Sequence, residues 1–197
     1  EAGETVEKFC EEFKIPFGES QAGKSACKSS HPYCLGGIGV TGTYASNIIA
    51  EDADVVIAIG SRMSDFTTSS KRLFKNPDVK FVTINNCRFH AYKMDAAKAV
   101  GDAKVTVEAL TKKLRARGYV SAYNGEIEEA KKVWDKEIVR LAGIEYTGDD
   151  FEPIIKARDP RTIPEFVKMT NGKITQTAAL AAIRRVIDED ATIITAG

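Results

Sequence analysis

Two short pairs of histidine and cysteine have a spacing that could bind a metal ion. They are His31-x-x-Cys34 and Cys87-x-x-His90, which together would supply two thiolates and two imidazoles for tetrahedral zinc. Neither pair has the zinc-finger order of two cysteines followed by two histidines, and a site would require two distant loops to meet. The alternative is that these residues lie incidentally in loops while Cys10 packs in a helix. We predict no metal site. We also predict reduced cysteines, because nothing marks the chain for secretion.

A glycine-rich stretch matches the letters of the dinucleotide fingerprint, with Gly37, Gly39 and Gly42 at the required spacing. That fingerprint binds a pyrophosphate when a strand immediately precedes it and a helix follows. The preceding residues 24–35 are polar and contain Pro32, so no strand is expected there. We therefore predict a tight loop packed on a sheet. The alternative is a nucleotide-like anion held by free backbone N–H groups.

A basic side chain, Arg62, follows an apolar run that ends at Gly60. Ligands of open α/β sheets gather at the carboxyl ends of strands, and a guanidinium can hold a phosphate through two hydrogen bonds. A surface or interdomain ion pair, for instance with Asp65, is an equally good interpretation of Arg62.

Two dipeptides, Asn85-Asn86 and Gly101-Asp102, contain parts of the Gly-Asp-Gly…Asn-Asn motif that binds magnesium diphosphates. Their order is reversed, and Ala103 stands where the motif has its second glycine. We reject this match. The sequence also has no catalytic triad, zinc-protease motif or Walker loop.

Hydrophobic periodicity predicts the elements that would position these residues. Apolar residues three and four apart predict helices, and unbroken apolar runs predict strands buried on both faces of a parallel sheet. The predicted helices are 4–13, 43–52, 103–117, 124–141 and 176–188, with one helical turn within 90–95. The predicted strands are 15–17, 54–60, 79–84, 99–100 and 191–195. This order predicts an α/β fold with a doubly wound, mostly parallel sheet, followed by the helix and strand of a further α/β domain.

The pattern divides the chain into three regions. Residues 1–117 are expected to form an α/β domain lacking its first strand, because a βα unit normally opens with a strand and this sequence opens with a helix. Residues 118–172 are expected to be a helix and an interdomain linker, since 143–172 are rich in charge, proline and glycine. Residues 173–197 are expected to begin another domain. The first residue is Glu1 and no signal peptide follows, so we expect a piece of a longer protein.

The composition excludes several classes of function. With 43% apolar and 28% charged residues among 197, the chain has the composition of a soluble globular protein. Its 28 basic and 28 acidic residues cancel, so no general attraction to nucleic acid or to an anionic membrane is expected. No apolar run is long enough for a transmembrane helix. We expect a cytoplasmic protein.

Several longer segments resemble the central domain of thiamine-diphosphate enzymes of the acetolactate synthase type. They are GGIGVTGTYASNIIAEDADVVIAIGSRMSDFTTSSKRLF from residue 36 and KFVTINNCRFHAYKMDAAKAVGDAKVTVEAL from residue 80. Within that family, GVTGT, SDFTTSSK, NCRFHAYK and the earlier IPFGESQAGKSA are most similar to the branch that opens an inositol-derived cyclic 1,2-dione by hydrolysis. The resemblance covers nearly the whole chain, and residues 175–197 resemble the start of the family's diphosphate-binding domain.

This resemblance implies a parent enzyme that uses thiamine diphosphate and Mg²⁺ to cleave a C–C bond by adding water. The family's active site lies between two other domains, usually from two subunits, so the resemblance implies that this chain is structural and inactive alone. Its implied partners are the remaining domains of its own chain and further copies in a homo-oligomer. The alternatives are an acetolactate synthase-like enzyme or a module that binds FAD or ADP.

The resemblance also implies which positions lie near cofactors. Gly39, Gly42, Arg62 and Asp102 match positions that line FAD or an adenosine diphosphate group in relatives, and Gly197 matches one near the thiamine diphosphate. The sequence has Asn85-Asn86 where many relatives carry acidic residues, which argues against adenosine binding, and SACKSSHPYCL also departs from the usual pattern. No cofactor is expected to bind this chain tightly.

Overall fold

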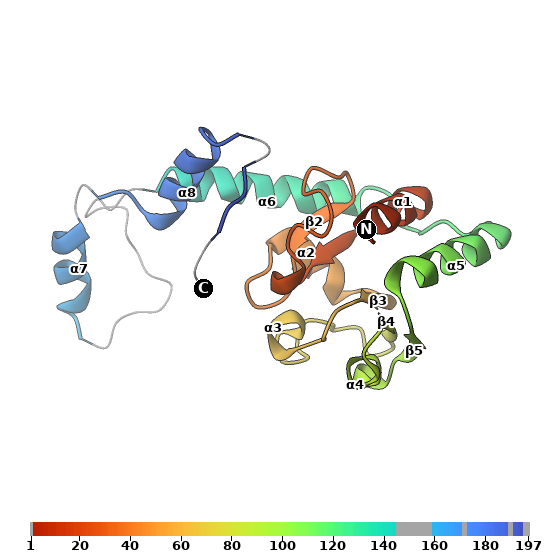
Figure 1. Ribbon diagram of the computed structural model, residues 1–197. Coiled ribbons are helices and arrows are strands. Elements are labelled where there is room, and N and C mark those ends of the chain that lie inside the picture. Colours follow the sequence, from red (N-terminus) through yellow and green to blue (C-terminus); the bar gives the residue numbers. More distant parts are fainter. Residues whose placement is uncertain (1, 145–158, 171–172, 189–190, 195–197) are drawn as a thin grey trace. The chain divides into compact units, whose positions relative to one another are not determined.

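The computed structural model describes residues 2–144, 159–170, 173–188 and 191–194. Its contacts divide the chain into two units, Glu1–Trp134 and Asp135–Gly197, which are described separately. The strands of the described residues all lie in the first unit, together with the helices that pack on them (Figure 1).

The elements alternate between helix and strand along the first unit. In chain order they are α1 (Gly3–Phe13), β1 (Phe17–Glu19), η1 (Gln21–Gly23), β2 (Cys34–Gly37), α2 (Tyr44–Glu51), β3 (Val55–Ile59), α3 (Asp65–Thr68), β4 (Lys80–Asn85), α4 (Arg88–Ala91), η2 (Lys93–Asp95), β5 (Ala97–Val100), α5 (Ala103–Ala116) and α6 (Glu126–Ala142). The second unit contains the end of α6 together with α7 (Thr162–Thr170) and α8 (Gln176–Arg184).

The strands form two sheets, and every strand pair in them is parallel. One sheet has the order β1-β2, with Phe17 opposite Cys34. The other has the order β3-β4-β5, with Ile57 opposite Val82 and Ile84 opposite Ala99. Because parallel strands need crossover connections, mostly helical, this arrangement confirms the predicted α/β class with a parallel sheet.

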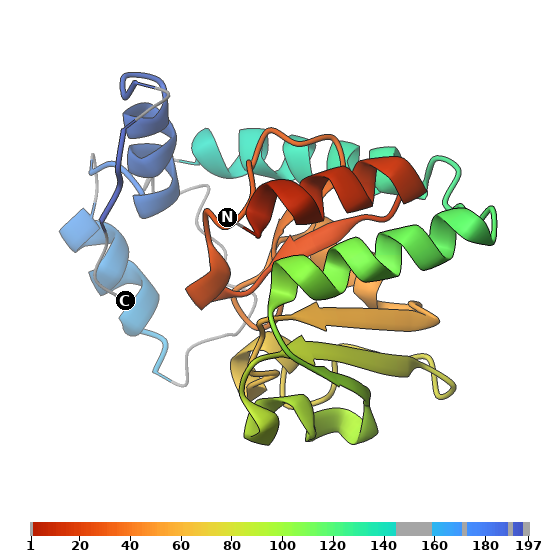
Figure 2. The same ribbon diagram turned by 45° about the vertical axis from the view of Figure 1, so that its right-hand side comes forward.

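Helices α1 and α5 lie side by side over one face of both sheets (Figure 2). Their buried side chains Phe9, Phe13 and Val107 form one core with Ile84 of β4. Fully burying side chains of this size contributes about 1.5–3 kcal/mol each. Partly buried residues of β1 and β3, among them Phe17, pack against the same core, so the two sheets share one covering layer.

The second core lies around β2 and involves α2 and the first half of α6. Buried Leu35, Ala45, Ile127 and Ala130 form it, and Trp134 packs against it. The helix predicted over 124–141 therefore forms and belongs in part to the first unit. The predicted division into 1–117, 118–172 and 173–197 stays a prediction about the longer protein.

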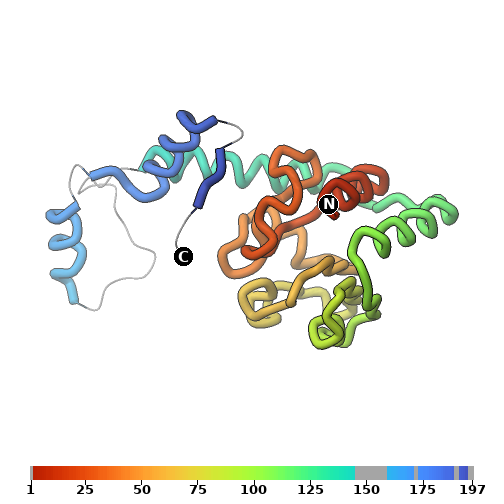
Figure 3. The backbone as a smooth tube through the Cα atoms, viewed as in Figure 1, coloured from red at the N-terminus to blue at the C-terminus, as the bar shows by residue number. Residues whose placement is uncertain are grey.

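The sequence did not predict β2, and the expectation that no strand precedes the glycine-rich loop was wrong. The strand was missed for a physical reason. β2 reads Cys-Leu-Gly-Gly and has no β-branched residue, and residues 20–33 before it form a crossover without an α-helix (Figure 3). The preceding strand was predicted over 15–17 but β1 spans Phe17–Glu19.

Two further elements differ from expectation at the other end of the chain. The predicted strand over 191–195 does not form within the described residues 191–194, where no described strand supplies the neighbour that a ladder requires. Helix α7 was not predicted, since Pro164 suggested a linker. Proline is compatible with the first turn of a helix, where its missing N–H has no intrahelical partner.

Helix α6 has 17 residues and carries charged side chains along its length. No helix among the described residues is long and apolar enough to cross a bilayer.

Candidate functional site

Loops that follow four of the strands meet at one edge of the first unit. The N–H of Gly60 donates to the carbonyl of Ile84 (2.8 Å), and the N–H of Gly101 donates to the carbonyl of Asn85 (3.1 Å), so β3, β4 and β5 end together. The loop after β2 joins them, because the N–H of Val40 donates to the carbonyl of Phe66 at α3 (2.8 Å). The carboxyl ends of parallel strands are where open α/β sheets bind ligands.

Several N–H groups in and next to the glycine-rich loop 36–42 donate to acceptors within the protein. The N–H of Ile38 donates to the carbonyl of Glu19 (2.9 Å), and the N–H of Gly39 donates to Oδ1 of Asn47 (3.0 Å). The N–H groups of Gly42 and Thr43 donate to the carbonyls of Gly39 (2.9 Å) and Gly37 (2.8 Å) respectively. These amides, with that of Val40, are therefore not available to cradle a phosphate.

The two glycines that the family resemblance assigns to a ligand are explained by close packing. A Cβ atom on Gly39 (φ +99°) would overlap the carbonyl oxygen of Phe66 and would lie 2.8 Å from Cα of Thr67. A Cβ atom on Gly42 would lie 2.8 Å from Oδ1 of Asn47 and from the carbonyl of Gly37. Both positions are filled by the protein's own backbone and side chains.

This geometry confirms the predicted tight loop but corrects the reason given for it. The strand β2 does precede the loop, and α2 follows it with Thr43 as N-cap, whose side chain accepts the Ser46 N–H. The strand–turn–helix context of a dinucleotide site is therefore present. The loop is closed because Asn47 bonds both the N–H and the carbonyl of Gly39 and because α3 packs directly on Gly39, so FAD or ADP binding finds no support here.

Arg62 lies in the loop after β3, and its side chain is exposed. Among the described residues it forms no ion pair with Asp65, and an ion pair with another domain stays a prediction. Its backbone carbonyl accepts a hydrogen bond from Nζ of Lys93 (3.0 Å), which joins the loop after β3 to η2. A phosphate-binding role for the guanidinium stays a prediction.

Asn85 connects two of the loops at this edge from a buried position at the end of β4. Its Nδ2 donates to the carbonyl of Ser61 (3.1 Å), and its Oδ1 accepts the N–H of Cys87 (2.9 Å). Only an amide can both donate and accept in this orientation, since an ionised carboxylate has no proton to give. This gives a structural reason for an amide at a position where an acidic residue was the family expectation.

We expect Asn85→Asp to destabilise the first unit by about 1–3 kcal/mol, because the aspartate would leave the Ser61 carbonyl unpaired and place a charge beside it. Chemical denaturation followed by Trp134 fluorescence measures this. The exposed neighbour provides the control, and Asn86→Asp is expected to change stability by less than about 0.5 kcal/mol. Equal effects of the two substitutions would contradict the bridging role.

Asp102 is the N-cap of α5, as its sequence context predicted. Its Oδ1 accepts the N–H of Val105 (2.9 Å), and its backbone carbonyl accepts the hydroxyl of Thr106 (2.7 Å). A cap of this kind contributes about 1 kcal/mol to helix stability. The local geometry thus accounts for Asp102, and its role near a ligand stays a prediction. Gly197 lies outside the described residues.

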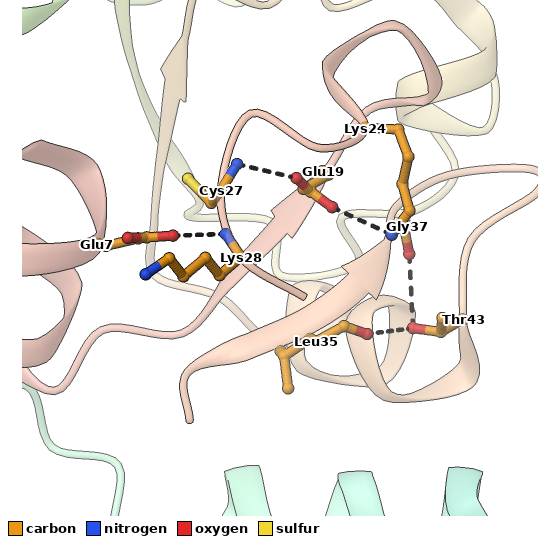
Figure 4. A network of polar contacts seen from close by, with 8 residues as sticks. All are labelled: Glu7, Glu19, Lys24, Cys27, Lys28, Leu35, Gly37 and Thr43. Atoms are coloured by element: carbon orange, nitrogen blue, oxygen red, sulfur yellow. Dashed lines mark hydrogen bonds and ion pairs between the residues drawn. The ribbon is translucent and has the colours of Figure 1, made fainter. Parts of the chain in front are cut away.

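Glu19 is a buried acidic residue at the end of β1 that the sequence analysis missed. Its side chain is 4% exposed, accepts the N–H of Cys27 (3.3 Å) and pairs with Nζ of Lys24 (3.3 Å), as Figure 4 shows. Glu7 of α1 accepts the N–H of Lys28 in the same loop. The two carboxylates therefore anchor the crossover loop 20–33 at Lys24, Cys27 and Lys28. The signal in the sequence was an acidic residue within an otherwise apolar segment before the loop.

The two histidine–cysteine pairs do not converge. His31 stacks near Phe17 and Tyr33 before β2, whereas Cys87 is the N-cap residue of α4 beyond β4. Across the described ranges, no group of three or more histidine, cysteine, aspartate or glutamate side chains is placed to hold a metal. All four cysteines are free thiols.

The cysteines should differ strongly in reactivity. Burial, with smaller contributions from Cys27, Cys34 and Glu7, raises the pKa of Cys10 from 9.0 to about 12. At pH 8 this lowers the thiolate population about 1000-fold, so an aromatic disulfide reagent should label exposed Cys87 first and Cys10 only on unfolding.

Because the pKa of Cys10 is raised in the folded chain, the stability linked to Cys10 is present below pH 9.0 and lost as the pH rises towards about 12. Rapid labelling of Cys10 in the folded chain would contradict its buried position.

Comparison with known proteins defines the class to which this fold belongs. The profile of the family described as "Thiamine pyrophosphate enzyme, central domain" matches residues 1–110. The chain therefore belongs to the thiamine pyrophosphate enzyme family, and the part that matches its central domain lies within the first unit.

Curated relatives narrow the similarity to one kind of enzyme. The chain is 57% identical over 194 residues to the 3D-(3,5/4)-trihydroxycyclohexane-1,2-dione hydrolases of Clostridium botulinum and Clostridium perfringens. It is 50% identical over the same length to hydrolase 2 of that name from Bacillus cereus. Each match covers 98% of this chain and 30% of the relative, so the chain spans less than a third of the length of these enzymes.

Proposed function

We propose that this chain is the central-domain region of an enzyme that hydrolyses 3D-(3,5/4)-trihydroxycyclohexane-1,2-dione, cleaving a C–C bond of the ring with the help of thiamine diphosphate and Mg²⁺. The observation that carries this proposal is the 57% identity to hydrolases of that name, which extends over 98% of the chain. The aligned stretch includes the second unit, for which the family profile gives no match. This degree of identity favours the hydrolase over an acetolactate synthase-like enzyme.

Within that enzyme, the role that we assign to this chain is structural. Thiamine diphosphate supplies the chemistry of C–C cleavage when it is bound. The described residues do not fit that cofactor or its metal, because five N–H groups of residues 38–43 already donate to protein acceptors and no cluster of metal-ligating side chains exists among the described residues. We therefore assign no catalytic step to Gly39, Gly42, Arg62 or Asp102.

The role that we assign to the first unit is then to hold the other domains of the enzyme in fixed relative positions. Two helical layers over parallel sheets, with polar side chains fixing the loops at the carboxyl edge, make a rigid support for neighbouring domains. We propose that its partners are the remaining domains of its own chain and further copies of the enzyme, in the cytoplasm, without nucleic acid.

A domain exchange tests the proposed function. The matching 194-residue stretch of the Clostridium botulinum hydrolase is replaced by this chain, and hydrolysis of 3D-(3,5/4)-trihydroxycyclohexane-1,2-dione is measured by chromatography of the ring-opened product. We expect activity within about tenfold of the parent enzyme, since the exchanged part carries no catalytic group. A folded chimera that assembles like the parent enzyme but does not hydrolyse the dione would overturn the proposal.

Calorimetry on this chain alone tests the structural role separately. We expect no saturable heat with thiamine diphosphate up to millimolar concentrations, with or without Mg²⁺. A clear binding isotherm would contradict the assignment of both cofactor contacts and catalysis to other domains.

A further inference from the structure

The outer surface of α4 and η2 carries two exposed aromatic rings beside a shallow hollow. Phe89 is 74% exposed and Tyr92 is 53% exposed, which is unusual for side chains of this size. Together with Arg88 and Lys93 they line a hollow of about 460 Å³ that is widely open to solvent. All four lining residues come from one short stretch of the chain.

Basic side chains surround these two rings. Nζ of Lys98 lies 4.5 Å from the centroid of the Tyr92 ring, and Cζ of Arg88 lies 6.0 Å from it. Nζ of Lys93 lies 5.5 Å from the centroid of the Phe89 ring. These separations are within the range of cation–π attraction, so the rings hold the cations at the surface.

No carboxylate of the described residues pairs with these cations. Within the described part of the chain, Arg88, Lys93 and Lys98 form no ion pair, although Asp95 lies in the same segment, and five other basic side chains are paired with carboxylates. In a chain whose charges cancel overall, this is a local concentration of uncompensated positive charge. An oppositely charged surface would be attracted to it and orientated by it.

The surface is held in place by buried contacts beneath it. Ala91 is fully buried, and its carbonyl accepts the hydroxyl of buried Thr83 on β4 (2.6 Å). Nζ of Lys93 is tied to the carbonyl of Arg62 (3.0 Å). Because the underlying backbone is fixed, the exposed rings and cations are arranged before any partner arrives, which lowers the cost of binding.

The form of the surface indicates the kind of ligand. Sites for small molecules enclose most of the ligand surface, and this hollow is too open for that. The ring faces are also approached by the protein's own cations, so they are poorly placed to stack on a base. Tyrosine, phenylalanine and arginine are instead typical of the centres of protein–protein interfaces.

We propose that the α4 surface, formed by Arg88, Phe89, Tyr92, Lys93 and Lys98, binds an acidic segment of another polypeptide. Carboxylates of that segment pair with the free cations, and an apolar side chain between them fills the hollow beside Phe89 and Tyr92. This proposal does not depend on the proposed enzymatic function.

A titration of the ¹⁵N-labelled 197-residue chain with a defined peptide tests it. The probe is a twelve-residue peptide of alternating glutamate and leucine, and the amide shifts of residues 86–100 are followed. We expect localised shifts there, weakened at least tenfold by the double substitution Arg88→Glu/Lys98→Glu and also by Phe89→Ala, which leaves all charges in place. The matched control, Lys112→Glu/Lys113→Glu on exposed positions of α5, is expected to leave affinity within twofold.

Several outcomes would overturn the proposal. Equal weakening by the control pair, or equal binding of a lysine–leucine peptide, would show that the interaction is nonspecific. Tighter binding of ADP or of an oligothymidylate at the same residues would assign the surface to a nucleotide or nucleic acid. Concentration-dependent shifts at these residues without any peptide would assign it to a second copy of the chain.

Discussion

The substitution Gly39→Ala is expected to destabilise the first unit by about 4 kcal/mol. About half of this follows from backbone strain, because φ is +99° at this residue and L side chains rarely adopt such a conformation. The other half follows from overpacking, since the new methyl group would overlap the carbonyl oxygen of Phe66 and crowd Cα of Thr67. Backbone atoms cannot move aside as the end of a flexible side chain can. Equilibrium denaturation followed by fluorescence of Trp134, the one tryptophan of the sequence, measures the loss.

A matched control separates the crowding from the conformation. Gly118 also has a positive φ, +61°, but no atom lies within 4 Å of the position that a Cβ would take. Gly118→Ala should change stability by no more than about 1 kcal/mol, because the strain is partly offset by the lower entropy of the unfolded chain. If both substitutions had the same small effect, the glycine-rich loop would not be packed against α3, and a ligand role for Gly39 would have to be reconsidered.

The sequence predicted those parts of the fold whose signal is local. Helix α1 forms over Gly3–Phe13 because Val6, Phe9, Cys10 and Phe13 line one face, and α5 begins where Asp102 caps it. Strands β3 and β4 lie where apolar runs predicted them. These elements carry their information within ten to fifteen residues, so periodicity and capping are sufficient.

The parts that were missed depend on contacts between distant residues. β2 is a strand because it pairs with β1 across the crossover loop, and its two glycines and cysteine give no local indication of this. The closed state of the glycine-rich loop depends on Phe66 and Asn47, which approach it only in the folded chain. Glu19 is buried because Cys27 and Lys24 return to it from the loop. A single sequence cannot show which of its distant residues meet.

The open edges of the two sheets bear on whether copies of this chain associate with one another. β1 pairs with β2 on one side, β3 pairs with β4 on one side, and no strand of the described residues occupies the other edge of either. Because β1 and β3 pack against the same core under α1 and α5, these edges belong to one layer. β3 reads Val-Val-Ile-Ala-Ile, a composition typical of a strand with neighbours on both sides, yet Val55 is 53% exposed. An unpaired edge strand of this composition exposes backbone N–H and C=O groups with which a strand of another chain can pair.

We therefore expect this chain to form dimers or larger assemblies in which an additional strand completes the sheet. Each backbone hydrogen bond gained contributes about 1 kcal/mol net. A candidate for the added strand is the segment 191–194 of another copy, since Ile193 and Ile194 are 65% and 91% exposed. Light scattering at micromolar concentrations measures the molar mass, and Val55→Lys should shift the chain towards monomer because a charge on an edge strand opposes pairing. Val139→Lys, at a 73% exposed position of α6, is the control and should leave the mass unchanged. A well-behaved monomer in the unsubstituted chain would show that these edges are satisfied without a partner.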